Sequence, residues 1–216
     1  ESVAINQLVL VNVDLNTEVI VYLKLSDAVK GMDAAMANID AGVNALRVGI
    51  GNGSNCTTRL KTGCGVPQAT AIMLCRQAIN GSQRNIGLIA DGGIRDSGDI
   101  VKALALGADS VMIGRLFAAT KETPGNLQSK GLRAVPSDLD LNLPWPEFTK
   151  RYQGQASITF MDSIGKMGVA PEGVTDFIPY RGPVGPIFND LIGGIRSGMT
   201  YVGAKNLYEL SEKATI

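Results

Sequence analysis

The stretch IADGGIRDSGDIVKALALGADSVMIGR, residues 89–115, contains the elements that decide the fold. Two short apolar runs, residues 86–91 and 110–114, have the length of strands, and residues 97–106 between them have the apolar spacing of a helix. A strand, a helix and a second strand in so short a span predict a parallel βαβ unit with a right-handed crossover.

The same alternation continues on the N-terminal side of this unit. Further apolar runs and helical segments lie at residues 9–13, 19–23 and 45–50, and at residues 26–41 and 67–80. Continuous apolar strands indicate a sheet covered on both faces, so we expect an α/β fold of the (β/α)8 TIM-barrel type. A complete barrel needs about 250 residues. With four βα units and one preceding strand, the chain is expected to hold the C-terminal half of a barrel.

The ends of the helices carry residues that favour caps. Ser26 and Ser97 are the expected N-caps, because a serine hydroxyl can accept a hydrogen bond from a free backbone N–H group. Gly42 and Gly107 each precede a strand and are the expected C-terminal glycines.

Glycine and polar residues follow three of the strands, in GNGSNC, DGGIRDSG and GRLFA. Active sites of barrel enzymes are built from the loops after the strands, so we expect these three loops to converge on one site.

Residues 121–182 differ in composition from the rest. They hold six of the nine prolines and the one tryptophan, Trp145, and we expect a flap here. Residues 184–210 return to helical spacing, with two helices separated near residues 198–203. We therefore predict one barrel-type catalytic domain over residues 1–216, N-terminally incomplete, with its flap at about 121–182.

The composition excludes several classes of function. The chain has 216 residues, 45% of them hydrophobic, and 20 basic against 20 acidic side chains, so nucleic acid and anionic membranes are not expected partners. No apolar run approaches the roughly 20 residues of a membrane span, and a cytoplasmic location is expected. The absence of histidine excludes Ser-His-Asp and Cys-His catalysis.

The loop GNGSNCTTRLKTGCG, residues 51–65, places Cys56 among glycines, hydroxyl residues and basic residues. A packing cysteine is expected in an apolar helix or strand, and Cys56 has no such surroundings. Cys64 and Cys75 are expected to be packing residues. An odd number of cysteines at these spacings fits neither a disulfide framework nor a CxxC metal site.

Four segments, taken in order, resemble the IMP dehydrogenase / GMP reductase family: RVGIGNGSNCTTRLKTGCGVPQ, IADGGIRDSGDIVKALALGADSVMIGRLFAAT, RYQGQAS, and PEGVTDFIPYRGPV with LIGGIRSGMTYVGAKNLYEL. The resemblance covers about residues 38–210. It implies a TIM-barrel oxidoreductase of purine metabolism that binds GMP or IMP, uses a nicotinamide cofactor and forms a homotetramer.

The resemblance also implies roles for single residues. Cys56 resembles the nucleophile that attacks C2 of the purine, Thr58 the threonine that activates ammonia or water, and Glu172 the glutamate that relays a proton with it. Asp91 resembles the ribose-binding carboxylate. The implied contacts to the phosphate or base are Ser54, Gly92, Gly93, Gly114, Arg115, Tyr152, Gly154, Gln155 and Ala156. Backbone carbonyls of Gly51, Gly53 and Cys56 resemble ligands of a monovalent cation such as K+.

Two departures from the family pattern stand out. Arg115 replaces a common serine or glycine, so its guanidinium is expected beside the phosphate or in solvent. The family's Asp-Ser cofactor motif and GGN strand end have no clear equivalents, and residues 19–29, which lie about where GGN is expected, do not match it.

The flap bears on the choice of reaction. Residues 153–180 contain no arginine, whereas the dehydrogenases of the family use an Arg-Tyr pair there, so the pattern favours GMP reductase with NADPH. The alternatives are IMP dehydrogenase with NAD, and a purine-nucleotide-binding fragment without catalysis.

Overall fold

The computed structural model describes residues 31–129, 134–135, 148–154, 156–165 and 170–215. They form two compact units. Unit 1 comprises Glu1–Asn52, Gly65–Ile113 and Asp190–Ile216, and unit 2 comprises Gly53–Cys64 and Gly114–Asn189. The strands expected at residues 9–13 and 19–23, and the cap expected at Ser26, lie outside the described residues.

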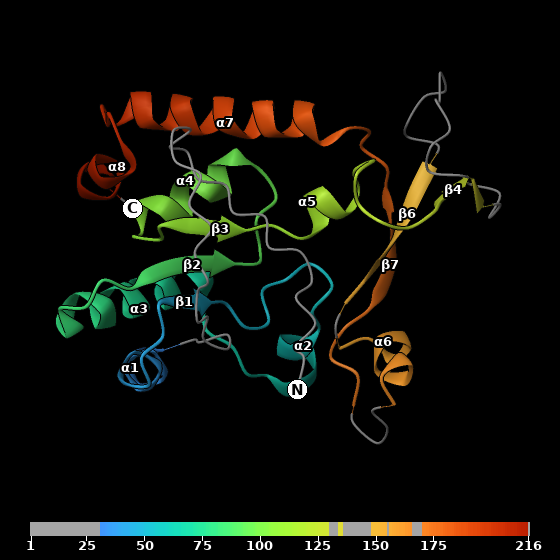
Figure 1. Cartoon of the computed structure of the whole chain (residues 1–216), viewed down its shortest axis with the longest axis horizontal. Helices are drawn as coiled ribbons and strands as arrows, with labels where there is room; N and C mark the ends of the chain where they lie inside the picture. Colours follow the sequence, from blue (N-terminus) through green and yellow to red (C-terminus); the bar gives the residue numbers. More distant parts are fainter. Residues whose placement is uncertain (1–30, 130–133, 136–147, 155, 166–169, 216) are drawn as a thin grey trace. The chain divides into compact units, whose positions relative to one another are not determined.

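Unit 1 is built on a parallel sheet of three strands in the order β1-β2-β3 (Figure 1). The strands are β1 (Ala45–Val48), β2 (Gly87–Asp91) and β3 (Ser110–Met112), and Leu46 pairs with Leu88 while Ala90 pairs with Val111. The helices are α1 (Met32–Asp40), α3 (Gln68–Ser82) and α4 (Ser97–Ala105). This confirms the alternation of strands and helices that the sequence predicts.

The core of unit 1 lies between this sheet and its helices. Leu46, Val48 and Leu88 are fully buried on the strands, and Ile39 and Cys75 are fully buried on α1 and α3. Because β1 and β2 carry buried residues at consecutive positions, their sequences show continuous apolar runs rather than alternation.

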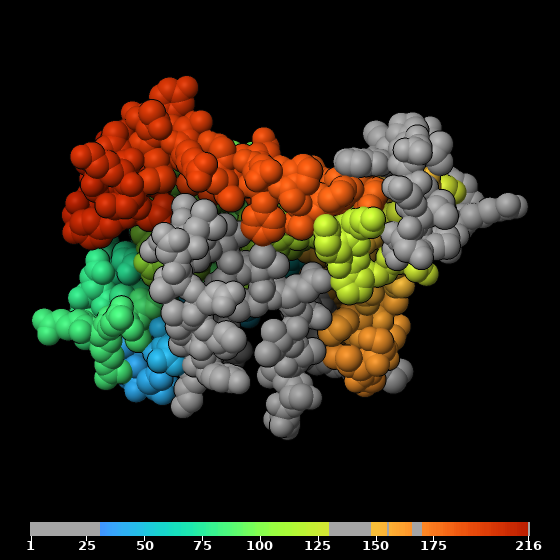
Figure 2. Space-filling model, turned by 45° about the horizontal axis from the view of Figure 1, so that its top comes forward, coloured from blue at the N-terminus to red at the C-terminus, as the bar shows by residue number. Residues whose placement is uncertain are grey.

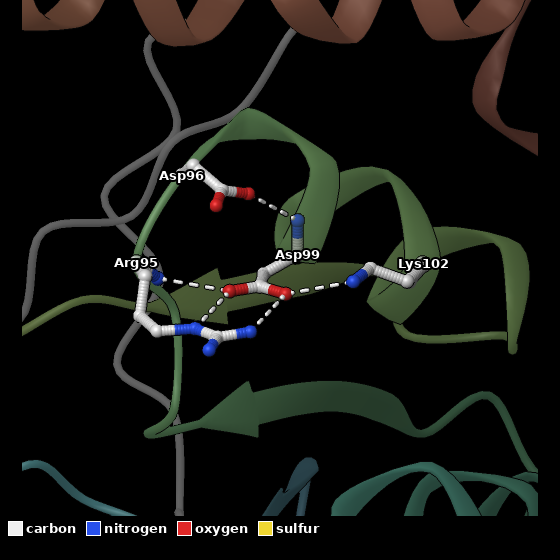
Figure 3. A network of polar contacts seen from close by, with 4 residues as sticks. All are labelled: Arg95, Asp96, Asp99 and Lys102. Carbon is white, nitrogen blue, oxygen red and sulfur yellow. Dashed lines mark hydrogen bonds and ion pairs between the residues drawn. The ribbon is translucent and has the colours of Figure 1, made fainter.

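The N-cap of α4 is Asp96, not Ser97. The Asp96 carboxylate accepts a hydrogen bond from Asp99 N at 3.0 Å, and Ser97 is already the first helical residue. Figure 3 shows this cap beside Asp99, whose carboxylate accepts hydrogen bonds from Arg95 and Lys102. Aspartate and serine cap about equally well, so composition alone could not choose between neighbours.

The C-terminal glycines stand where the sequence places them. Gly42 and Gly107 have φ angles of 83° and 104°, in the left-handed region that favours glycine. After α4, Gly107 N donates to Leu104 O and Ala108 N donates to Ala103 O, and this pair of hydrogen bonds defines a Schellman motif. The motif turns the chain directly into β3.

The C-terminal segment forms α7 (Val184–Tyr201) and α8 (Leu207–Lys213). Two helices are confirmed, but α7 continues through Gly198, and the break falls at residues 202–206. In Figure 2 the red atoms of α8 and of the end of α7 form one exposed surface of unit 1. The glycines of α7 have a packing reason: a Cβ on Gly194 would overlap Ser97 Oγ, and one on Gly198 would lie 2.9 Å from Val101 Cγ2.

Unit 2 contains an antiparallel sheet in the order β5-β4-β6-β7, which the sequence did not predict. Its strands are β4 (Leu127–Ser129), β5 (Ala134–Val135), β6 (Phe148–Gln153) and β7 (Thr175–Pro179), and its short helices are α2 (Thr58–Thr62), α5 (Arg115–Ala118) and α6 (Ile158–Ser163). The described part of the expected flap is thus organised around paired strands.

Lys150 on β6 is a buried cation in this sheet, with only 1% of its surface exposed. Its ammonium group donates to Thr120 O at 2.6 Å and to Thr123 O. Burial lowers the pKa of the Lys150 ammonium group, because desolvation disfavours its charge. The side chain ties β6 to the segment that follows α5.

The prediction of one domain with a flap at residues 121–182 stays a prediction. Within the described residues, no helix is both long enough and apolar enough to cross a membrane.

Candidate functional site

Cys56 lies in a turn between β1 and α2, within unit 2. Cys56 N donates to Gly53 O at 3.0 Å, and the side chain is partly buried. The thiol is therefore held at the start of a short helix and keeps access to solvent, which a reactive cysteine needs.

Three backbone segments meet around Gly173. Thr57 N donates to Glu172 O at 2.7 Å, and Val174 N donates to Asn55 O at 2.9 Å, so the cysteine segment pairs antiparallel with residues 172–174. On the other side, Glu172 N donates to Ala156 O at 3.1 Å. A Cβ on Gly173 would lie 3.0 Å from the Ala156 carbonyl carbon, which explains the glycine of the PEG sequence.

This pairing brings together the three residues predicted to be catalytic. Thr58 Oγ1 donates to Glu172 Oε2 at 2.7 Å and lies 3.1 Å from Cys56 Sγ. All three side chains are partly buried. Thr58 and Glu172 are 114 residues apart in the sequence, and the backbone bond from Thr57 to Glu172 holds them in register.

The arrangement can move a proton in a defined direction. Because Thr58 donates its one hydroxyl hydrogen to the Glu172 carboxylate, it can only be the acceptor in its contact with the Cys56 thiol. If the thiol proton passes to Thr58 Oγ1 and the threonine proton passes to Glu172, the products are a thiolate and a neutral carboxyl group. The contacts from Cys56 through Thr58 to Glu172 thus form a path that a proton can follow without a histidine.

Asp91 lies in unit 1, at the end of β2. Its carboxylate accepts a hydrogen bond from Arg47 Nη1 at 2.8 Å and is about one quarter exposed. Burial raises the pKa of the Asp91 carboxyl group, and the charge and hydrogen bond of Arg47 oppose that rise. The side chain stays accessible, as a group that receives a hydroxylated ligand must be.

Gly92 and Gly93 follow Asp91 with φ angles of 84° and 79°. Two consecutive residues in the left-handed region turn the backbone sharply, and only glycine adopts this conformation without strain. Gly92 also has Asn52 close by, since a Cβ there would lie 3.1 Å from Asn52 Nδ2.

Gly114 and Tyr152 lie together in unit 2. A Cβ on Gly114 would come 2.6 Å from Tyr152 Oη, so the glycine leaves room for the phenol. Arg115 donates through Nη1 to Asp176 Oδ2 at 2.9 Å and to Asn55 Oδ1 at 3.3 Å. The guanidinium was expected beside the phosphate or in solvent, and its ion pair with the Asp176 carboxylate was not foreseen.

The remaining predicted residues are distributed as follows. Ser54 is exposed, and Gly154 is packed against Asn55 O, where a Cβ would lie 3.1 Å away. Ala156 contributes the carbonyl that receives Glu172 N, whereas Gln155 lies outside the described residues. Gly53 uses its carbonyl in the turn at Cys56. The cation site predicted at Gly51, Gly53 and Cys56 stays a prediction.

The other two cysteines behave differently from each other. Cys75 is fully buried in α3, and burial raises the pKa of its thiol to about 11, so it is a packing residue as predicted. The prediction for Cys64 is wrong: this residue is exposed after α2, beyond Gly63, whose φ of 67° ends the helix.

Three amide side chains that the sequence reading missed hold the loops. In unit 1, Asn52 Nδ2 donates to Asp91 O at 2.9 Å, and Gln68 Nε2 donates to Val48 O at 2.9 Å. In unit 2, Asn55 is 4% exposed and donates to Tyr152 O and to Val174 O, both at 3.1 Å. Amide residues within glycine-rich loops are the sequence signal that could have identified them.

Comparison with known proteins gives a consistent result. A family model described as "IMP dehydrogenase / GMP reductase domain" matches residues 24–216. Inosine-5'-monophosphate dehydrogenase of Aquifex aeolicus is 44% identical over 191 residues, which cover 84% of this chain and 36% of that protein. GMP reductase of Leishmania donovani is 38% identical over 187 residues, with the same two coverages.

A crystal structure of a GMP reductase variant from Trypanosoma brucei, in complex with guanosine 5'-monophosphate, matches with a TM-score of 0.75 and 37% identity. The match covers 88% of this chain and 37% of that one. The fold is thus the predicted α/β fold of the TIM-barrel type, and the chain spans a little over a third of the length of these relatives.

Proposed function

Because this chain belongs to the IMP dehydrogenase / GMP reductase family, we propose that it acts at C2 of a purine nucleoside monophosphate and converts GMP to IMP with NADPH. The observation that carries the proposal is the relay from Cys56 through Thr58 to Glu172. It joins a nucleophile to a carboxylate that can store and return its proton.

The relay accounts for the proton that is transferred in the first half of the reaction. Cys56 gives its proton through Thr58 to Glu172, and the thiolate forms a bond to C2 of GMP. The bond from C2 to the amino nitrogen then breaks, and the proton stored on Glu172 returns through Thr58 to the departing amino group. The products are a covalent purine adduct on Cys56 and ammonia, with no proton needed from outside.

NADPH, when bound, would supply the hydride that releases IMP from this adduct. Residues 19–29, where the GGN strand end of the family is expected, lie outside the described residues.

The substrate contacts are proposed residue by residue. The Asp91 carboxylate accepts both hydrogen bonds of a ribose diol, and Gly93 offers its N–H group to the phosphate. In unit 2, Gly114 and Tyr152 contribute further phosphate contacts, and Ser54 is exposed for the same purpose. Gly92, Gly154, Gln155 and Ala156 complete the set that contacts the nucleotide.

Two observations favour the reductase over the dehydrogenase. Residues 153–180 contain no arginine that could serve as a base for hydrolysis. The glutamate is already bonded to Thr58 at 2.7 Å, as a group that protonates an amino leaving group should be. Conversion of IMP with NAD is the second candidate, favoured by the 44% identity to the Aquifex aeolicus dehydrogenase.

Absorbance at 340 nm separates these candidates. The chain is incubated with GMP and NADPH, and separately with IMP and NAD, beside a Cys56→Ala variant. We expect loss of NADPH with GMP that depends on Cys56. Cysteine-dependent NADH formation from IMP would replace the reductase by the dehydrogenase. Bound nucleotide with no absorbance change in either mixture would mean that the chain is a purine-binding fragment.

Three further properties remain proposals drawn from the family. They are a homotetrameric assembly, a cytoplasmic location and activation by K+ held through backbone carbonyls. Addition of KCl against NaCl in the same assay tests the cation.

A further inference from the structure

We infer that Asn55, held by Arg115 and Asp176, is a positioning residue that sets the cysteine segment against the glutamate segment. Asn55 immediately precedes Cys56, and its side chain is almost fully enclosed at 4% exposure. The inference deepens the proposed function and rests on it for the assignment of Cys56 as the nucleophile.

Asn55 uses its backbone and its side chain on the same partner. Asn55 O accepts from Val174 N at 2.9 Å, while Asn55 Nδ2 donates to Val174 O at 3.1 Å. The second amide hydrogen has Tyr152 O as its acceptor, also at 3.1 Å. One residue therefore binds the backbone of residue 174, two positions from Glu172, and the backbone of β6.

Arg115 determines which way the Asn55 amide faces. Its Nη1 donates to Asn55 Oδ1 at 3.3 Å and to Asp176 Oδ2 at 2.9 Å. With the oxygen facing a guanidinium, the amide nitrogen must face the two carbonyls, because a reversed amide would put a donor against a donor. Asp176 on β7 in turn holds the guanidinium in place.

The ion pair itself contributes little to stability. The Arg115 and Asp176 side chains are 39% and 45% exposed, and exposed pairs are weak. Its effect is expected instead on alignment: a shift of the Cys56 segment along residues 172–174 would separate Thr58 Oγ1 from Glu172 Oε2. Displacements of about 1 Å in a reacting group can cost about 100-fold in rate.

Arg115 therefore has two competing explanations with different kinetics. If Arg115 binds the phosphate of GMP, its replacement should raise KM for GMP. A positioning residue would lower kcat and leave KM nearly unchanged. The structure favours the second, since the guanidinium is already engaged by a carboxylate and an amide.

The test uses the whole chain in a Cys64→Ser background, so that the exposed thiol does not interfere. The variants are Arg115→Met, Asp176→Asn and Asn55→Leu, with Arg115→Lys as the conservative replacement. Arg151→Met, which removes an exposed arginine of the same unit, is the matched control. Steady-state kinetics with GMP, thermal unfolding and the rate of Cys56 alkylation by iodoacetamide are measured for each.

For Arg115→Met and Asp176→Asn we expect kcat to fall about 10- to 100-fold, with KM for GMP changed less than about threefold. Cys56 alkylation should slow, as we also expect for a Glu172→Gln reference variant, because the thiol loses its proton acceptor. Arg115→Lys should recover most of the loss, and Arg151→Met should match the parent. If Asn55→Leu does not fold, Arg115→Met and Asp176→Asn still test the positioning role.

A rise in KM for GMP with unchanged alkylation would assign Arg115 to the phosphate and overturn the inference. Unchanged kinetics and an unchanged alkylation rate would mean that Arg115 and Asp176 form a surface ion pair without a positioning role, and would also overturn the inference. If the parent chain has no activity with GMP, the proposed function fails, but the alkylation rates still test whether the network positions Cys56.

Discussion

Thr58 is the residue on which the candidate chemistry depends most, because its hydroxyl contacts both the Cys56 thiol and the Glu172 carboxylate. Replacement by valine keeps the shape and removes the hydroxyl that bonds Glu172 at 2.7 Å. We expect Thr58→Val to lower kcat by about 10²- to 10⁴-fold, the usual contribution of proton transfer, with little effect on KM. Steady-state kinetics with GMP and NADPH measure both parameters.

Thr62→Val is the matched control for that variant. Thr62 lies in the same helix, is exposed, and uses its hydroxyl only within α2 and its C-terminal turn, donating to Thr58 O at 2.8 Å. Its replacement should leave kcat within about twofold of the parent. Equal effects at positions 58 and 62 would show that loss of helix structure, rather than loss of the relay, explains the result.

The relay shows how far sequence reading reached at the residue scale. Cys56, Thr58 and Glu172 could be named because they stand in long motifs that resemble a known family. Their mutual distances could not be obtained, since Glu172 is brought to Thr58 by backbone pairing of residues 114 positions apart. Asn55 was missed because its partners Tyr152, Val174 and Arg115 lie 60 or more residues away in the sequence, so that an amide in a glycine-rich loop was the one local signal.

At the scale of single elements, α4 depends on charges at its first turn (Figure 3). The pKa of the Asp99 carboxyl group lies well below its usual range, chiefly because of the hydrogen bond from Arg95 and with help from Lys102. A lowered folded pKa means that the ionised form stabilises the fold. That contribution is complete above about pH 4, the unfolded value, and is lost as pH falls through the lower folded value.

We therefore expect Asp99→Asn to lower the free energy of unfolding by about 0.5–1 kcal/mol at pH 7, since both cationic partners are mostly exposed. The difference between parent and variant should shrink steadily below pH 4. Urea unfolding at pH 7, 4 and 3 measures it. A difference that stays constant over this range would contradict a contribution from the ionised carboxylate.

The neighbouring glycines of α7 give a sharper prediction about packing. Gly193 has open space where a side chain would lie, whereas a Cβ on Gly194 would overlap Ser97 of α4. Gly193→Ala should stabilise the protein by up to about 1 kcal/mol through helix propensity. Gly194→Ala should destabilise it by about 1–3 kcal/mol through overpacking. Urea unfolding of both variants tests this, and the same sign for both would refute the close approach.

Sequence patterns predicted elements better than their boundaries. The alternation of apolar runs and helical segments identified β1, β2 and β3 and the helices α1, α3 and α4, but not the short helix α2. The two glycines after α1 and α4 were correctly placed. The end of α7 was misplaced at Gly198, because glycine usually weakens a helix. Here it is present because Val101 of α4 lies too close for a side chain, a tertiary reason that the local sequence does not show.

At the scale of the whole molecule, the antiparallel sheet of unit 2 was the largest element not foreseen. Its strands β4, β6 and β7 come from a proline-rich region that was read as a flap, and their apolar content is low. Pairing holds this sheet together through backbone bonds and a few buried side chains, such as Leu127, Phe148 and Ile178. Such strands lack the long apolar runs that reveal the strands of unit 1.

Nucleotide binding should be visible as a change in the stability of the whole chain. A ligand that binds only the folded state at 100 times its Kd adds about 2.7 kcal/mol, or about 5–10 °C in Tm for a chain of this size. We expect this shift with GMP and a smaller one with 2'-deoxy-GMP, because the deoxy sugar lacks one hydroxyl of the diol proposed to bind Asp91.

Asp91→Asn should bind GMP more weakly and lose this discrimination, whereas Asp40→Asn, which changes an exposed carboxylate at the end of α1, should retain it. Thermal unfolding of the three proteins with each nucleotide decides the matter, and an Asp91→Asn variant that still distinguishes the two sugars would remove Asp91 from the ribose site.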